Sequence, residues 1–255
     1  MVLLELKEIT KAYIEKGKYF SVIDEIDLVV KEGEFVVIVG PSGSGKSTVV
    51  RIAAGLVPPT KGQVLYKEQP LSGPNPNASI VFQNFALIPW LTVQENIELV
   101  LEARGIPPRQ RIRTALKYID LVGLDSFEDA YPRELSGGMK QRVGFARALA
   151  VEPEILFMDE PFSSLDVLTA ADLREEFLKL WTSGKLSIRS VVMVTHNIEE
   201  AILMSDRIVV LSTRPSKVVG EIEVSLPRPR DVHSKEFESI LDHLYALIVS
   251  SHISK

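Results

Sequence analysis

The stretch LSGGMKQR, residues 135–142, decides how the rest of the chain is interpreted. Ser136 is suited to cap a helix over residues 139–150, and Gly137 and Gly138 allow another backbone to approach closely. The first amides of such a helix point outward and attract phosphate. A lone Ser-Gly-Gly before a helix is more often an ordinary capped turn. The phosphate interpretation therefore depends on two further segments.

The first of these segments is a phosphate-binding loop upstream. Residues 40–47 read GPSGSGKS and fit the pattern G-x-x-x-x-G-K-[ST], and the apolar run 35–39 and residues 48–54 predict a strand before it and a helix after it. Glycines free backbone amides to surround the β-phosphate, Lys46 supplies a point charge to the β- and γ-phosphates, and the Ser47 hydroxyl can bind Mg²⁺. The residues expected to bind the nucleotide here are Gly40, Pro41, Ser42, Gly43, Ser44, Gly45, Lys46, Ser47 and Thr48.

The second segment is a pair of carboxylates after a short apolar run. Residues 155–158 are typical of a strand buried on both faces, and Asp159 and Glu160 follow directly. Because consecutive strand side chains point to opposite sides, the two carboxylates can serve different tasks. We expect Asp159 to face the metal, usually through water, and Glu160 to orient and polarise the water that attacks the γ-phosphate.

Together these segments resemble the nucleotide-binding subunit of an ATP-binding cassette (ABC) transporter, and the resemblance extends over residues 3–231. It implies an α/β P-loop NTPase fold of the ABC-ATPase type, with a RecA-like core, an N-terminal antiparallel β layer and a helical signature subdomain. The implied organisation is an ABC ATPase domain over residues 1–231, with the helical subdomain inserted at about 85–150. A C-terminal helical extension then covers residues 232–255.

The resemblance also implies roles for isolated residues. Gln83 looks like the residue that senses Mg²⁺ and the γ-phosphate, and His196 looks like the switch histidine on that phosphate. Both follow apolar runs, which places them at strand ends near the phosphates. Tyr13 looks like the aromatic that stacks on adenine, although Tyr19 and Phe20 are close enough in sequence to compete for this role. Catalysis is thus expected from Lys46, Gln83, Glu160 and His196, and metal binding from Ser47, Gln83 and Asp159.

A dimer follows from the same resemblance. Two copies pack head to tail, so that the Ser-Gly-Gly of residues 136–138 in one chain closes over the ATP and Mg²⁺ held by the other. Residues 163–166, SSLD, look like the loop that communicates across this dimer. Two departures from the common family pattern, Met139 for Gln and Ser164 for Ala, are expected to affect hydrolysis little.

The remaining partners are membrane proteins. The family contacts its transmembrane permease subunits through the helical insertion, so residues 85–91 become the expected coupling surface, with Trp90 as either an exposed contact or a packed core residue. A solute-binding protein is an indirect partner. The motif Thr92 to Glu95 has the form of a capping box, which predicts a helix that runs to about Arg104.

Other segments predict the surrounding sheet. Residues 3–9, 26–30 and 35–39 are expected to be strands of an antiparallel N-terminal layer, with Glu32 and Gly33 as the turn between the last two. Residues 191–194, 198–204 and 208–211 predict a strand, a helix and a strand, which restores a parallel α/β pattern.

Composition restricts the compartment and the partners. The formal net charge of −5 argues against nonspecific DNA binding, and the absence of cysteine excludes disulfides. The N-terminus lacks a basic start and a long apolar region, and no run of about 18 apolar residues occurs. These features agree with a cytoplasmic protein, and the resemblance to a transporter subunit implies that it is peripheral on the cytoplasmic face of the cell membrane.

Three segments favour one branch of transporters. Residues 88–93 (IPWLTV), Arg214 with Pro215, and residues 226–231 (LPRPRD) resemble importers of nitrate, sulfonate, taurine or related small solutes. A soluble cassette ATPase acting on DNA or ribosomes is the alternative, because the same hydrolytic residues serve such proteins. Chromosome-organising relatives insert a long coiled coil before the signature, and this chain has no sustained heptads there. A small P-loop kinase would lack both the signature and the paired carboxylates.

Overall fold

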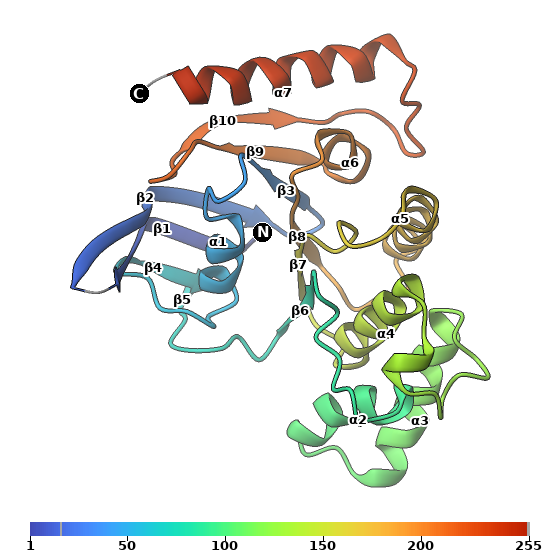
Figure 1. The fold of residues 1–255 in the computed structure, drawn as a ribbon. Coiled ribbons are helices and arrows are strands. Elements are labelled where there is room, and N and C mark those ends of the chain that lie inside the picture. Colours follow the sequence, from blue (N-terminus) through green and yellow to red (C-terminus); the bar gives the residue numbers. More distant parts are fainter. Residues whose placement is uncertain (16, 254–255) are drawn as a thin grey trace. The chain divides into compact units, whose positions relative to one another are not determined.

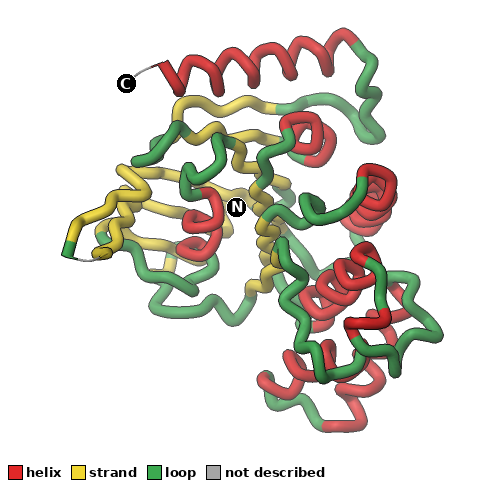
Figure 2. The backbone as a smooth tube through the Cα atoms, viewed as in Figure 1, coloured by secondary structure: helices red, strands yellow, loops and turns green. Residues whose placement is uncertain are grey.

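The computed structural model describes residues 1–15 and 17–253 of the 255-residue chain. Backbone contacts divide it into two compact units, Met1–Asn75 with Arg189–Lys255, and Pro76–Ile188. Both units contain helices and strands, as the ribbon and tube show (Figures 1 and 2). Among the described residues, no helix is both long enough and apolar enough to cross a membrane.

An antiparallel sheet forms the N-terminal part of the first unit. Its strands are β1 (Val2–Glu15), β2 (Lys18–Lys31), β4 (Lys61–Tyr66) and β5 (Gln69–Pro70), in the order β2-β1-β4-β5. Neighbouring strands are antiparallel throughout, which confirms the predicted layer for residues 3–9 and 26–30. Its extension to residues 35–39 is wrong, because these residues pair in parallel with two strands of another sheet. Both β1 and β2 extend well beyond the predicted ranges, because they continue past the core as a hairpin with exposed side chains.

A parallel sheet carries the phosphate loop in the same unit. Strand β3 (Phe35–Val39) lies between β8 (Ser190–Val194) and β9 (Arg207–Leu211) and runs parallel to both. Strand β10 (Val218–Glu223) pairs antiparallel with β9. Every residue of β3 and β8 is buried, as expected for central strands rich in β-branched side chains. The carboxyl ends of β3 and β8 meet at one edge of this sheet, where ligands bind in such folds.

Three helices belong to the first unit: α1 (Lys46–Ala53), α6 (Ile198–Met204) and α7 (Lys235–Ile253). The predicted strand, helix and strand towards the C-terminus are confirmed as β8, α6 and β9. Helix α7 runs alongside β10 (Figure 1) and comes close to its backbone, since a Cβ at Gly220 would lie 3.1 Å from Leu247 Cδ1.

The second unit combines two parallel strands with helices. Strands β6 (Ala78–Phe82) and β7 (Ile155–Asp159) pair in parallel. The helices are α2 (Val93–Ala103), α3 (Pro108–Leu121), α4 (Gly137–Ala150), α5 (Val167–Thr182) and the 3₁₀ turn Pro132–Glu134.

The capping box that the sequence predicts is present at the start of α2. The amide of Glu95 donates to Thr92 Oγ1 at 3.2 Å, and the amide of Thr92 donates to Glu95 Oε2 at 2.8 Å. These two bonds satisfy amides that a helix start leaves unpaired. The helix ends at Ala103, one residue before the predicted end, and Arg104 forms its C-cap.

Candidate functional site

The phosphate loop connects β3 to α1. Lys46 is buried, and its Nζ donates to the carbonyl oxygens of Gly40 at 2.9 Å and Pro41 at 3.1 Å. A Cβ at Gly40 would lie 2.8 Å from the carbonyl oxygen of Leu211, so only glycine fits against β9 there. Gly45 has φ +93, a left-handed conformation that L side chains rarely adopt. The two glycines thus shape a loop that wraps around the lysine ammonium.

The start of α1 provides the other groups expected at a phosphate site. Its first turn contains no acidic residue, so no carboxylate within that turn opposes the positive end of the helix dipole. Ser47 and Thr48 lie in this turn, and Ser42 and Gly43 form the exposed tip of the loop. Ser44 is buried, and in the described part of the chain its Oγ finds no hydrogen-bond partner. Backbone amides and hydroxyls therefore converge where an anion binds favourably.

Two aromatic side chains lie on the β1–β2 hairpin of the same unit. The register places Tyr13 opposite Phe20, so both project from the same face of the hairpin, and both are exposed. Lys11 Nζ lies 5.0 Å from the Tyr13 ring centroid, and the Arg214 guanidinium lies 4.6 Å from the Phe20 ring centroid. Arg214 Nη2 is also only 3.8 Å from where a Cβ on Gly43 would be. Arg214 thus reaches from Phe20 to the tip of the phosphate loop, a role that no sequence pattern indicated.

His196 follows β8, the strand beside β3, and its side chain is exposed. The residue before it is fixed to the sheet, because the Thr195 amide donates to the Ile38 carbonyl oxygen at 3.2 Å. The residue after it caps α6, because Asn197 Oδ1 accepts from the Glu200 amide at 3.1 Å. The backbone on both sides of the histidine is therefore held by hydrogen bonds.

The acidic pair and Gln83 end two adjacent strands of the second unit. The register of β6 and β7 pairs Phe82 with Asp159, so Gln83 and Glu160 directly follow the ends of two neighbouring strands. Asp159 is buried, Glu160 is half-buried and Gln83 is exposed. Strand β7 ends at Asp159, and Glu160 has φ +48. The expected strand alternation between the two carboxylates is therefore wrong, because the chain turns into a left-handed conformation at Glu160.

The signature segment starts α4 as a capped helix. The Met139 amide donates to Ser136 Oγ at 3.3 Å, which confirms the predicted N-cap, and the first turn contains no acidic residue. The helix begins at Gly137, two residues earlier than predicted. A Cβ at Gly138 would lie 2.5 Å from Thr169 Cγ2, whereas Gly137 has more room. Gly138 is therefore required for close packing within the subunit, and the exposed Ser136 and Gly137 remain accessible to a ligand.

Side chains from two other elements hold the segment after β6. Ser164 Oγ donates to the carbonyl oxygen of Gln83 at 3.0 Å. Arg147 on α4 donates to the carbonyl oxygens of Phe85 at 2.9 Å and Ala86 at 2.6 Å, and burial lowers the pKa of its guanidinium. Phe85 and Ala86 have φ +62 and +48, conformations that are costly for residues with a Cβ. Arg147 thus stabilises a strained turn directly after Gln83.

A buried amide fixes the rest of this loop. Asn96 on α2 is fully buried, and its Oδ1 accepts from the Ile88 amide at 2.8 Å. Its Nδ2 donates to the carbonyl oxygens of Leu91 at 3.0 Å and Thr92 at 2.9 Å. Trp90 is 73% exposed, so the interpretation of this residue as a packed core residue is wrong. A polar residue on the otherwise apolar face of α2 is the one sequence signal that indicates Asn96.

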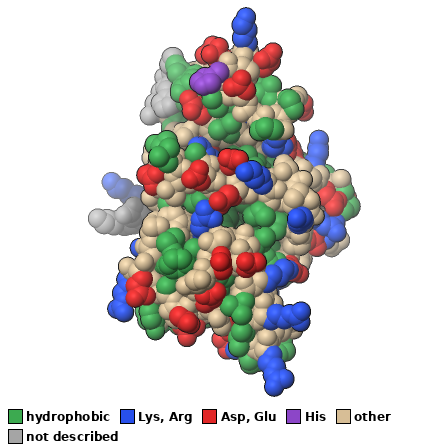
Figure 3. All heavy atoms as spheres, turned by 90° about the vertical axis from the view of Figure 1, so that its right-hand side faces the viewer, with side chains coloured by type: hydrophobic (Ala, Val, Ile, Leu, Met, Phe, Trp, Pro, Cys, Tyr) green, Lys and Arg blue, Asp and Glu red, His purple; other side chains and the backbone are tan. Residues whose placement is uncertain are grey.

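Each unit brings part of the expected site together. The first unit holds the phosphate loop, Tyr13 and His196, and the second holds Gln83, the acidic pair and the signature segment. On the face shown in Figure 3, acidic and basic side chains are interspersed. The features suited to phosphate that the two units provide are local ones, namely helix starts, backbone amides and Lys46.

Comparison with known proteins gives the same family by an independent route. Residues 23–163 match the ABC transporter family. The chain is 47% identical over 236 residues to an uncharacterised ABC transporter ATP-binding protein of Methanocaldococcus jannaschii, covering 92% of this chain and 87% of the relative. It is 42% identical to the nitrate import ATP-binding protein of Synechocystis, covering 88% and 83% of the two chains. It is 38% identical to the aliphatic sulfonates import ATP-binding protein of Bacillus cereus, covering 93% and 92%.

A solved structure agrees with these relatives. The dimeric post-hydrolysis state of an ATP-binding cassette bound to ADP and Pi superimposes with a TM-score of 0.76 and 34% identity, covering 88% of this chain and all of the other. The predicted fold class is thereby confirmed. This chain belongs to the ABC transporter family and is an ATPase, an ATP-binding subunit built on the P-loop ABC fold.

Proposed function

We propose that two copies of this chain dimerise head to tail around ATP and thereby drive the import of a small solute through a membrane permease. The observation that carries this proposal is that each unit has a helix start suited to phosphate: α1, whose N-cap is Gly45, and α4, whose N-cap is Ser136. Neither helix has an acidic residue in its first turn. One follows the phosphate loop and the other follows Ser136. Each can bind phosphate oxygens, and the sandwich arrangement uses both on one nucleotide.

The nucleotide cycle follows from the charge of the γ-phosphate. Lys46 and the loop amides bind the β- and γ-phosphates of one copy, and residues 136–138 of the second copy close over them. Hydrolysis removes the γ-phosphate and with it the extra affinity that favours the closed dimer. Support comes from the dimeric cassette with ADP and Pi, whose structure this chain resembles.

Glu160 is the proposed group that orients the attacking water, and His196 and Gln83 are proposed to contact the γ-phosphate. The donor set expected for Mg²⁺ is the Ser47 hydroxyl, the Gln83 side chain and, through water, Asp159. These are oxygen donors, which Mg²⁺ prefers, and Mg²⁺ takes many of its ligands from nucleotide phosphates and water.

Adenine is proposed to stack on Tyr13, whose ring is exposed on the hairpin face that also carries Phe20. Arg214 then offers a cation beside the phosphate loop. Residues 1–231 would form the ABC ATPase domain with a helical subdomain inserted at about 85–150, and residues 232–255 would form a C-terminal extension.

The permease is proposed to dock on residues 85–91, where Trp90 is exposed on a loop held by Arg147 and Asn96. This surface would place the subunit on the cytoplasmic face of the membrane, with a solute-binding protein as an indirect partner. The cargo is proposed to be nitrate, a sulfonate, taurine or a similar small solute, since relatives that import nitrate and sulfonates share 42% and 38% identity over most of the chain.

Two substitutions test the nucleotide part of the proposal. Lys46→Ala should abolish ATP binding or turnover, whereas Lys61→Ala, on the exposed part of β4, should leave both unchanged. Glu160→Gln should retain ATP binding and accumulate dimers on size-exclusion chromatography, while the exposed Glu68→Gln should not. A strictly monomeric profile of Glu160→Gln at saturating ATP and Mg²⁺ would refute the sandwich.

The transport part needs a separate observation. Genes for a permease and a solute-binding protein beside the gene for this chain would support import. Genes for DNA-processing or ribosomal partners in their place would favour the soluble alternative.

A further inference from the structure

The segment LPRPRD, residues 226–231, follows β10 and is here called the arginine strap. Pro227 and Pro229 have no amide hydrogen, so the strap cannot continue the ladder of β10. The two arginines between and after them turn instead towards the carboxyl end of α6. Nothing in the proposed function of the chain accounts for this segment.

Both arginines bind the last carbonyl groups of α6. Arg228 Nη2 donates to the carbonyl oxygen of Met204 at 2.6 Å. Arg230 Nη1 donates to the carbonyl oxygens of Ser205, at 2.6 Å, and of Ile202. The last carbonyls of a helix have no partner inside the helix, and a positive charge at this end also stabilises the helix dipole. The strap therefore acts as a two-arginine cap on α6.

The other nitrogens of Arg230 fix it to the strap and to the end of β10. Its Nε donates to the carbonyl oxygen of Leu226 and its Nη2 to that of Val224, both at 3.1 Å. Burial, together with repulsion from Arg228, lowers the pKa of Arg230 to about 10, so the side chain remains charged at neutral pH. A rigid guanidinium with five donors can satisfy this many carbonyls at once, and a lysine cannot.

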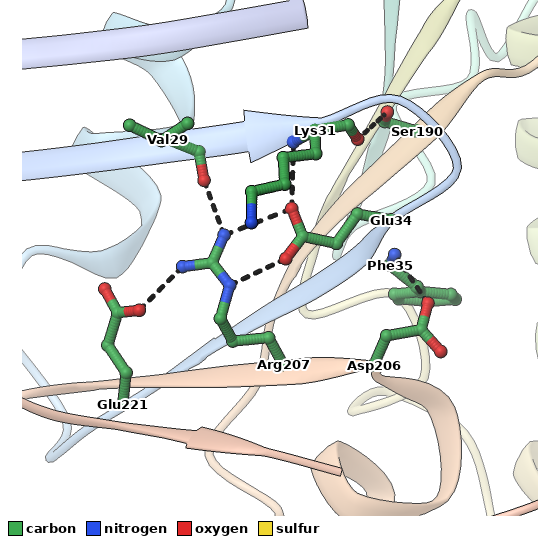
Figure 4. Close-up of polar contacts among 8 residues, drawn as sticks. All are labelled: Val29, Lys31, Glu34, Phe35, Ser190, Asp206, Arg207 and Glu221. Atoms are coloured by element: carbon green, nitrogen blue, oxygen red, sulfur yellow. Dashed lines mark hydrogen bonds and ion pairs between the residues drawn. The ribbon is translucent and has the colours of Figure 1, made fainter. Parts of the chain in front are cut away.

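Arg228 connects the same cap to the central strand. Its Nη1 forms an ion pair with Asp206 Oδ1 at 2.6 Å, and Asp206 Oδ2 accepts from the amide of Phe35 at 2.9 Å. Figure 4 shows Asp206 directed at the first residue of β3, beside the ion pairs that Arg207 makes with Glu34 and Glu221. The carboxyl end of α6 is thereby tied to β3, the strand that leads into the phosphate loop.

The opposite end of α6 carries His196. The helix has only seven residues, about 10 Å in length, and its N-cap is the residue after the histidine. A helix this short has little stability of its own, so tertiary contacts determine where it sits, and these include its buried face, with Ala201 and Ile202, as well as the bonds at its two ends. The strap fixes one end, and the bonds of Thr195 and Asn197 fix the other.

We propose that Arg228 and Arg230 are positioning residues that set the placement of α6 and, through it, of His196 for the γ-phosphate. This inference rests on the proposed role of His196. A strap that only stabilises the fold would lower the melting temperature without a selective effect on turnover. A positioning strap lowers kcat through His196 and leaves the affinity for ATP nearly unchanged, because the phosphate loop lies on a different element.

A double-mutant cycle on the full chain tests the link. ATP turnover and thermal unfolding are measured for the wild type, Arg230→Met, His196→Ala and the double variant, with the exposed Arg113→Met as matched control. We expect Arg230→Met to lower kcat about tenfold with KM for ATP changed less than about twofold. In the His196→Ala background the same substitution should lower kcat further by less than about twofold. If Arg230→Met does not fold, Arg228→Lys replaces it, since lysine keeps the ion pair with Asp206 but loses the second contact.

The outcomes separate the inference from the function on which it rests. An unchanged kcat in folded Arg230→Met, or the full tenfold loss repeated in the His196→Ala background, would overturn the positioning role alone. An unchanged kcat in His196→Ala would reject the role of His196 itself, and the positioning role with it. Turnover of Arg113→Met should equal that of the wild type.

Discussion

Arg147 offers the clearest quantitative test of how the loop after β6 is held. The guanidinium binds the carbonyl oxygens of Phe85 and Ala86, two residues with positive φ. Methionine keeps the apolar stem of the side chain but removes both donors. Arg147→Met therefore removes the hydrogen bonds with little change in packing.

The expected loss in unfolding free energy follows from the two hydrogen bonds of Arg147 and from the strain of the two residues with positive φ. A hydrogen bond to a charged group contributes about 1.5–3 kcal/mol, and the bond to Ala86 is worth less than this because it is exposed. Each left-handed residue with a Cβ costs roughly 1–2 kcal/mol. Once the bonds are lost the turn can relax and recover part of that strain. We expect a net loss in unfolding free energy of about 1–2 kcal/mol, which lowers Tm by roughly 2–8 °C for a chain of this size.

The assay combines thermal unfolding with amide hydrogen exchange. Exchange should accelerate at residues 85–87, while the Ile88 amide, held by Asn96, serves as an internal reference and keeps its protection. Arg147→Lys, which can reach one carbonyl at a time, should give an intermediate effect, and the exposed Arg113→Met should give none. Wild-type Tm and wild-type exchange in Arg147→Met would show that the turn keeps its conformation without the guanidinium, and our reasoning would be refuted.

Three other substitutions probe further contacts. Gly138→Ala should cost about 1–3 kcal/mol of unfolding free energy by overpacking against Thr169 Cγ2, and Thr169→Ser, which removes that methyl group, should restore most of the loss in thermal melts. Asn96→Asp keeps the shape of the side chain but replaces the Nδ2 donor by an acceptor that faces carbonyl oxygens. We expect the free energy of unfolding, measured with denaturant, to fall by about 2–4 kcal/mol. A smaller loss than that of the exposed Asn84→Asp would contradict this. Hydrogen bonds to the Thr169 side chain and backbone hold the pKa of Asp166 below its ordinary value of 3.8. The contribution of the ionised Asp166 to folding stability is therefore present above that value and is lost as pH falls through the folded-state pKa. Asp166→Asn should therefore flatten the fall of Tm below about pH 4, and parallel pH profiles would count against this.

Features that are local in sequence could be predicted. The capping box at Thr92, the N-cap at Ser136 and the phosphate loop between a strand and a helix each depend on residues within a few positions of one another. Hydrophobic periodicity places the flanking elements, with ends that differ by one or two residues in α2 and α4. These are cases in which side-chain chemistry and backbone preference agree.

Features that depend on contacts between distant parts of the chain could not be predicted from the sequence. Arg147, Arg214 and the arginine strap bind carbonyls or rings that lie far along the chain, and no spacing rule connects such pairs. The turn at Glu160 also escaped prediction, because the alternation rule holds only while the strand continues. Assignments of single residues to nucleotide, metal and water remain predictions for the experiments above.

The hydroxyl of Ser164 carries a mechanical consequence. An alanine at this position would have no hydrogen to donate, whereas the serine hydroxyl donates to the carbonyl oxygen of Gln83. This bond couples the SSLD loop to the backbone of Gln83, so a displacement of one favours a displacement of the other for as long as the bond is made. The one oxygen atom that distinguishes serine from alanine thus links two loops that this contact would otherwise leave separate.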